Sequence, residues 1–252
     1  MSPRLHLLSA LILGGLMTLH TLSAHAAGGF GFDRTRVVVM AGSRGGTLIT
    51  AMNGTSTLYL LQSRVEAADG ATGVPLEGKE ARDGLPFLVT PPLERVLPQT
   101  RLPLRILEKP GHALATDREA LFFISVKAIP AGSAPEGGGE GMRLMLALQQ
   151  TVKLFWRPKG LAEDAIYRGE VAPKLKMQVS GTTLQVTNPT PYFITFRELK
   201  VGGRALDSFT LRAMVPPKGS QTYTLPAGTT GTGISWTITD EYGNPTTPQE
   251  QK

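Results

Sequence analysis

Residues 117–130 read Asp-Arg-Glu-Ala-Leu-Phe-Phe-Ile-Ser-Val-Lys-Ala-Ile-Pro, and their centre, 121–129, is a rich apolar stretch. Its β-branched and aromatic side chains predict a strand, which Pro130 ends. Shorter segments of the same kind precede it, at residues 36–40, 47–52, 58–66, 87–90 and 102–107. The chain contains 29 glycines and 19 prolines, which favour short strands over long helices. Several short strands separated by turns predict a β-sandwich.

An unusually long apolar run follows this stretch. The composition of residues 131–141 predicts a flexible loop, and residues 142–156 then read as one extended strand of about 15 residues, longer than the usual 5–6. Four apolar side chains alternate along one face of the run: Met142, Leu144, Leu146 and Leu148. Met145 and Ala147 keep the other face apolar as well. Arg-Pro-Lys-Gly at residues 157–160 ends the run and predicts a domain boundary.

A second series of short strands occupies the rest of the chain. The predicted strands are residues 175–179, 183–188, 192–199, 220–225 and 233–239. This part has the length of one further immunoglobulin-sized sandwich. The predicted fold is therefore all-β, with two β-sandwich domains in tandem at residues 27–156 and 157–252.

The first 26 residues resemble a secretory signal peptide. Arg4 precedes an apolar run at residues 7–19, and Ala24-His25-Ala26 fits the small-x-small cleavage pattern. A retained membrane anchor is the alternative, but the run is shorter than the ~20 residues that a membrane span needs. No later segment is long enough, so we expect cleavage after Ala26, export and no stable membrane insertion.

Composition argues against an enzyme. The chain has no cysteine, and only His112 of its four histidines lies beyond the predicted leader. This excludes thiol chemistry and a typical zinc site, and His112 follows Pro110-Gly111 in a predicted exposed loop. We expect no metal and no cofactor. The net charge of +6 is spread along the chain rather than clustered, which argues against a nucleic-acid partner.

Several motifs together resemble one protein family. They occur in family order at Thr35-Arg36, 86–92 with Arg95, 117–123, 126–130, 148–158, 188–192 and Tyr242-Gly243. In this combination the chain is similar to the periplasmic pilus-assembly chaperones, the PapD-like family. The resemblance implies a boomerang of two immunoglobulin-like domains that binds fimbrial subunits one-to-one in the periplasm and delivers them to an outer-membrane usher.

The resemblance also assigns roles to particular residues. Met142, Leu144, Leu146 and Leu148 would belong to an edge strand lent to the subunit, whose groove they would fill. An exposed apolar edge strand needs a partner, whereas an ordinary core strand would explain any one of these residues alone. Arg36 and Lys153 would hold the subunit's C-terminal carboxylate, to which such cations form charge-assisted hydrogen bonds.

A third implied feature is an ion network between the domains. Glu119 and Arg157 match two of its members, and Glu241, or else Asp240, matches the third. We expect this network to orient the domains rather than to add net stability, because the free energy needed to remove charges from water offsets much of the free energy gained when they pair.

Other questions stay open at the level of sequence. The family usually has Trp at Arg64 and Gly at Gln99, and its long-loop branch carries cysteines that this chain lacks. The branch, the subunit and the usher are therefore not determined. A secreted two-domain adhesin or structural pilus component is the alternative within the same fold, and an exported enzyme is the alternative outside it.

Overall fold

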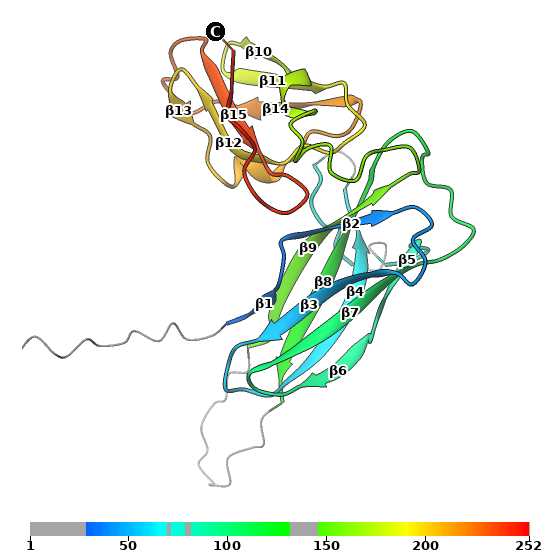
Figure 1. The fold of residues 1–252 in the computed structure, drawn as a ribbon. Helices are drawn as coiled ribbons and strands as arrows, with labels where there is room; N and C mark the ends of the chain where they lie inside the picture. The colour runs from blue at the N-terminus through cyan, green and yellow to red at the C-terminus, as the bar shows by residue number, and fades with distance from the viewer. Residues whose placement is uncertain (1–28, 70–71, 79–81, 132–145, 252) are drawn as a thin grey trace, which may run out of the picture.

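The computed structural model describes residues 29–69, 72–78, 82–131 and 146–251, which form two lobes rich in strands (Figure 1). The lower lobe in the figure contains β1–β9, and the upper lobe contains β10–β15. The predicted signal peptide lies outside the described residues. In the part of the chain that is described, no helix is long and apolar enough to span a membrane.

The N-terminal lobe is a sandwich of two sheets. One sheet has the order β1-β3-β7-β5, formed by Phe30–Phe32, Thr47–Asn53, Thr100–Glu108 and Phe87–Thr90. The other has the order β2-β9-β8-β4-β6, formed by Arg36–Met40, Leu148–Arg157, Ala120–Pro130, Tyr59–Ala67 and Leu93–Val96. β2 runs parallel to β9, and every other pair in the two sheets is antiparallel.

Both faces of β8 are covered, which explains its continuous apolar sequence. Phe122, Ile124 and Val126 point into the core between the two sheets. Leu121 and Phe123 point outward and pack with Phe155 and with Met214 of the other lobe. The stretch that predicts the sandwich therefore also contacts the second domain.

The C-terminal lobe is a second sandwich with its own core. One sheet has the order β10-β11-β14, formed by Lys176–Ser180, Thr183–Asn188 and Gly219–Thr224. The other has the order β13-β12-β15-β16, formed by Arg204–Ala205, Phe196–Val201, Ile234–Ile238 and Gln249–Gln251. Two 3-10 turns complete the lobe, η1 at Ala172–Lys174 and η2 at Thr210–Arg212. The predicted pair of β-sandwiches in tandem is confirmed.

The long strand predicted at residues 142–156 is wrong in its extent. β9 begins only at Leu148, and Leu146 and Ala147 lie outside any strand. Pairing with β8 ends at Ala128 and Leu148, close to the end of β8 at Pro130, and Leu146 and Ala147 are paired with no strand of the described chain. Met142 and Leu144 lie outside the described residues.

Candidate functional site

The pairing register of β2 and β9 places the first two residues of the candidate site side by side. Arg36 is paired with Lys153, so the two side chains leave the same face of the sheet next to each other. That face carries Phe155 as well, with the Cζ atom of Arg36 5.6 Å from the centroid of its ring. The parallel pairing thus brings together two cations that lie 117 positions apart in the sequence.

These two cations line a cleft of about 820 Å³ between the lobes. Arg197 and Arg212 of the C-terminal lobe line the same cleft. Among the described residues that line it, none is an aspartate or a glutamate. Cations gathered without a lining acid repel one another and favour an anion between them. The cleft can therefore bind a carboxylate or another small anionic group.

Arg36 is more tightly held than its motif suggests. Its side chain is buried, and its Nη1 atom donates a hydrogen bond of 2.9 Å to the carbonyl oxygen of Thr239 in the other lobe. Its Nε atom has no hydrogen-bond partner within the described chain. Burial lowers the pKa of Arg36 to about 10, against the attraction of Asp240, Glu119 and Glu241. Arg36 thus stays charged at neutral pH.

Lys153 has weaker contacts. Its Nζ atom lies 3.3 Å from the hydroxyl of Thr195 in the other lobe. Burial, with the charge of Arg36 as the second cause, lowers the pKa of Lys153 to about 7. A carboxylate placed beside this ammonium would favour its charged form. We expect anion binding near neutral pH to be accompanied by uptake of a proton.

The lowered pKa of Lys153 predicts a pH dependence of stability. The pKa of Lys153 is about 7 in the folded protein and near its ordinary value of 10.5 in the unfolded chain, so the unfolded chain binds more protons between these pH values. The destabilising effect of Lys153 is therefore full below pH 7 and disappears as the pH rises toward 10.5. Urea unfolding of wild type and Lys153→Met at pH 6, 8 and 9.5 should show an advantage for the variant that shrinks as pH rises. A difference in stability between Lys153→Met and wild type that does not change with pH would contradict the lowered pKa of Lys153.

A buried ion network of Glu119, Arg157 and Glu241 lies next to Arg36. The Nε atom of Arg157 lies 2.6 Å from Glu119 Oε1, and its Nη2 atom lies 2.8 Å from Glu241 Oε1. Arg157 Nη1 also donates to the carbonyl oxygens of Ala162 and Glu163. Burial raises the pKa of Glu119, although Arg157 opposes that effect. Burial opposes the charge of Arg157, but the two carboxylates outweigh it and raise the pKa of Arg157.

Glu241, rather than Asp240, contacts Arg157. The two carboxylate oxygens of Glu241 also accept hydrogen bonds from the backbone N–H groups of Ile166 and Tyr167, at 3.0 and 2.9 Å. Asp240 Oδ1 instead accepts bonds from the N–H groups of Tyr242 and Asn244, and so shapes the turn that follows. The structure brings Glu119, Arg157 and Glu241 together.

The motif Tyr242-Gly243 lies at a close approach between the lobes. Gly243 has φ +91°, and a Cβ atom there would lie 2.8 Å from the hydroxyl oxygen of Thr35 in the other lobe. A side chain at this position would clash and would also strain the backbone. The two short motifs at opposite ends of the sequence therefore meet in space.

The first half of β9 has an open edge. β2 pairs with residues 153–157 of β9 only, and in the described ranges no strand pairs with residues 148–152 on that side. Contact with β1 there is through a side chain, the amide of Gln150, which donates to the carbonyl oxygen of Phe30 at 2.7 Å. Leu148 and Leu146 are 45% and 65% exposed. Of the four predicted groove-filling residues, Leu148 is the first residue of this open edge, which leads to Lys153, and Leu146 lies two residues before it.

Sequence reasoning missed Arg197 and Arg212. Each is one of many scattered basic residues, and nothing in the local pattern marks it. Both reach the cleft only because the C-terminal lobe packs against Phe123 and Phe155. Their position depends on the contact between lobes, for which neither segment has a sequence signal.

Comparisons with known proteins agree with this arrangement. Residues 29–162 match the family model "Pili and flagellar-assembly chaperone, PapD N-terminal domain", and residues 170–250 match "Pili assembly chaperone PapD, C-terminal domain". The probable fimbrial chaperone protein ElfD of Escherichia coli O157:H7 is 36% identical over 228 residues, which cover 90% of this chain and 88% of ElfD.

Solved structures of chaperones share the fold. The Salmonella enterica SafB chaperone, solved in complex with the SafA pilin, matches with a TM-score of 0.72 and 29% identity, covering 88% of this chain and 95% of that one. The periplasmic chaperone SfaE matches with a TM-score of 0.66 and 30% identity, covering 88% and 98%. With both domain models matched in order along the described lobes, this chain belongs to the PapD family of pilus-assembly chaperones.

Proposed function

We propose that this protein is a periplasmic chaperone that binds pilus subunits one-to-one and passes them to an outer-membrane usher. One observation carries the proposal: the open edge of β9 leads directly into the cleft that holds Arg36 and Lys153. An extended chain paired to that edge would end with its carboxylate beside the two cations. The function is binding, and no catalytic step is assigned to any residue.

The open edge supplies two kinds of contact. Residues 148–152 have unpaired main-chain groups on one side, which can form a ladder with an incoming strand. The exposed side chains of Leu146 and Leu148 can enter an apolar groove of the partner, and we propose the same for Met142 and Leu144. An exposed apolar edge favours aggregation unless a partner covers it. A subunit that lacks one strand of its own sandwich would be such a partner.

We expect Leu146→Asp to leave the chaperone folded but unable to keep a subunit soluble. Leu146 is 65% exposed, so its replacement should hardly change the free energy of unfolding of the free chaperone. In the complex, by contrast, the new carboxylate would be buried without a counter-charge. Leu97→Asp is the matched control, because Leu97 is 56% exposed and lies beyond β6, at the other edge of the sheet. Soluble subunit recovered after co-expression is the measurement. A loss of the chaperone's own melting transition in Leu146→Asp would contradict the proposed role.

The location in the periplasm rests on residues 1–26 and on the family. We propose that these residues are a signal peptide and that the mature domains are residues 27–156 and 157–252. Intact mass of the protein released from the periplasm should correspond to a chain that starts at Ala27. A mass that still includes Met1 to Ala26 would contradict the proposed cleavage.

The ion network is proposed to fix the angle between the domains. Glu119 comes from the N-terminal sandwich, Arg157 is the last residue of β9 at the boundary between the domains, and Glu241 comes from the C-terminal sandwich. Their pairing joins the two lobes beside the cleft. It would therefore set the distance between Arg36 and Lys153 on one lobe and Arg197 and Arg212 on the other.

A further inference from the structure

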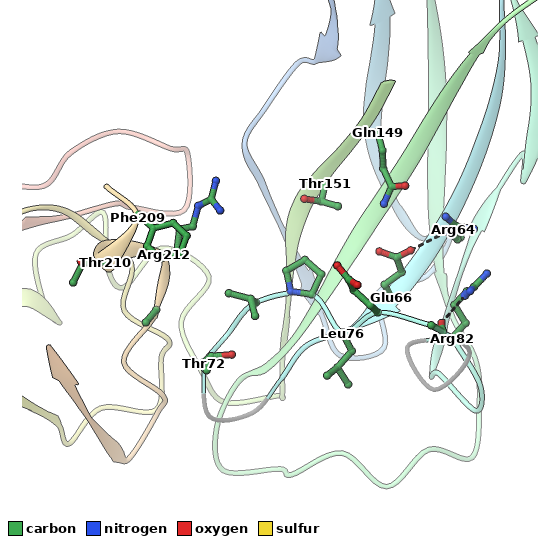
Figure 2. Close-up of a pocket in the computed structure, with 15 residues that line it drawn as sticks. Arg64, Glu66, Thr72, Leu76, Arg82, Gln149, Thr151, Phe209, Thr210 and Arg212 are labelled. Atoms are coloured by element: carbon green, nitrogen blue, oxygen red, sulfur yellow. Dashed lines mark hydrogen bonds and ion pairs between the residues drawn. The ribbon is translucent and has the colours of Figure 1, made fainter. Parts of the chain in front are cut away.

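A second hollow of about 820 Å³ lies beside the cleft that holds Arg36 and Lys153, and it opens between the same two lobes (Figure 2). Figure 2 shows Gln149, Thr151 and Leu76 on the N-terminal side, and Phe209, Thr210 and Arg212 on the C-terminal side. The two hollows share four lining residues, Val74, Pro75, Thr151 and Arg212. They form one continuous surface that follows the outer face of β9.

Phe209 is the most exposed large apolar side chain on this surface, at 75%. The turn that carries it is held in place by Asp207, whose Oδ1 atom accepts hydrogen bonds of 2.9 Å from the N–H groups of Phe209 and Thr210. Leu211 anchors the same turn in the core of the lobe. The ring is thus presented on a fixed turn, which lowers the entropy lost when a partner covers it.

Arg212 adds a charge beside the ring. Its Cζ atom lies 5.5 Å from the centroid of the Phe209 ring. On the N-terminal side, Arg64 and Glu66 neutralise each other through a 2.9 Å ion pair. Within the described ranges, no salt bridge involves Arg212 or Arg197. The C-terminal side therefore offers an exposed aromatic ring with unpaired positive charge next to it.

We propose that Phe209 and Arg212 form a second binding surface that holds the folded body of the pilus subunit through an apolar side chain flanked by a carboxylate. The inference rests on the proposed function. A subunit paired to residues 148–152 and anchored beside Lys153 would cover Gln149 and Thr151, which line the second hollow. The occupant is therefore the same subunit, and the positive charge selects an acidic face on it.

This surface would decide which subunits are accepted. Main-chain pairing and a terminal carboxylate are features that any incomplete sandwich can offer, so β9 and the two anchoring cations discriminate little between subunits. Side-chain contacts at Phe209 and Arg212 depend on the sequence of the partner. Specificity arises from such differences in affinity, and buried aromatic and Arg residues commonly dominate them.

The test compares a whole subunit with its tail alone. The subunit is obtained by co-expressing products of the genes neighbouring this one, and the tail is a synthetic peptide that copies the subunit's C-terminal strand with a free carboxylate. Phe209→Ser and Arg212→Glu should each weaken binding of the whole subunit by about tenfold. Both variants should bind the peptide as wild type does. Leu93→Ser and Lys176→Glu are matched controls, because both residues are exposed and neither lines the two hollows.

Three results would overturn the inference. Whole-subunit affinity within about twofold of wild type in both variants would show that the surface is not used. An equal loss of affinity for the peptide would place the effect at the β9 edge instead. If wild type binds neither the subunit nor the peptide, the proposed function is overturned, and this inference with it. Unchanged melting temperatures of the variants exclude misfolding as the cause of a loss.

Discussion

Replacing Arg36 or Lys153 with alanine is expected to abolish or greatly weaken capture of a pilus subunit. Each cation would form a charge-assisted hydrogen bond to the subunit's terminal carboxylate, and each such bond contributes about 1.5–3 kcal/mol. Losing one should weaken binding by roughly tenfold to a hundredfold. It should also let the incoming strand slip along β9, because the anchor fixes where the strand ends. Recovery of a one-to-one complex after co-expression measures the effect.

The free protein should tolerate these two changes to different degrees. Arg36→Ala removes the hydrogen bond to the carbonyl of Thr239, so we expect a loss of about 1 kcal/mol in the free energy of unfolding. Lys153→Ala removes a desolvated ammonium and should cost no stability at neutral pH. Arg101→Ala, at an exposed position on β7 away from the cleft, is the control for a lost positive charge. Wild-type recovery of the complex with either cleft variant would argue against the anchor.

Replacing Arg157 with alanine is expected to cause the largest loss of stability. The change leaves the carboxylates of Glu119 and Glu241 buried without their cation, and breaking a buried pair in this way costs about 3–5 kcal/mol. It also leaves the carbonyl oxygens of Ala162 and Glu163 without this donor. Urea unfolding should therefore show a lower midpoint. Lys200→Ala breaks an exposed pair with Glu198 and should cost only about 0–1 kcal/mol.

A triple variant separates charge burial from packing. Arg157→Met combined with Glu119→Gln and Glu241→Gln removes all three charges, and we expect it to regain much of the stability that Arg157→Ala loses. If the network orients the domains, the triple variant should bind subunits poorly although it is stable. A mild effect of Arg157→Ala, equal to that of Lys200→Ala, would contradict a structural role for the network.

Sequence patterns predicted the central strands better than the edges. β8 is predicted well because both of its faces are buried and its sequence is a continuous apolar run that includes Phe122, Phe123, Ile124 and Val126. The pattern did not indicate β6, which follows two prolines and carries Glu94 and Arg95, or the short β1, β13 and β16. These strands lie at or near the edges of sheets, where only part of the strand is buried and the pattern is weak.

One predicted strand of the second domain was placed too early. Residues 192–199 read as a strand, but β12 starts only at Phe196. The segment before it forms a turn in which the side-chain amide of Asn188 donates to the carbonyl of Tyr192, at 2.7 Å. The hydroxyl of Tyr192 meanwhile bonds to the backbone of Ala162. Ile194 makes only an isolated antiparallel bridge to Val215, so this segment does not join β12. Tyr192 and Ile194 are buried in the core of the C-terminal lobe, and Phe193 packs against the cluster between the lobes.

The candidate site was predictable only where a motif marks it. Arg36, Lys153, Glu119 and Arg157 stand inside motifs of the family, and the structure brings them to one end of the N-terminal sheet. Phe209 and Arg212 lie outside every motif, and their place beside β9 follows from the packing of Met214 against Phe123 and Phe155. Residue contacts between domains leave no periodic signal in either segment.

The proposed anchor is tested most directly by changing the charge of the partner instead of the protein. Affinity is measured for a peptide that copies a subunit's C-terminal strand, once with a free carboxylate and once with a C-terminal amide. Wild type should bind the amide about ten- to a hundredfold more weakly, and in Arg36→Ala or Lys153→Ala the difference between the two peptides should largely disappear. Equal affinity of wild type for both peptides would contradict capture of the carboxylate by these two cations.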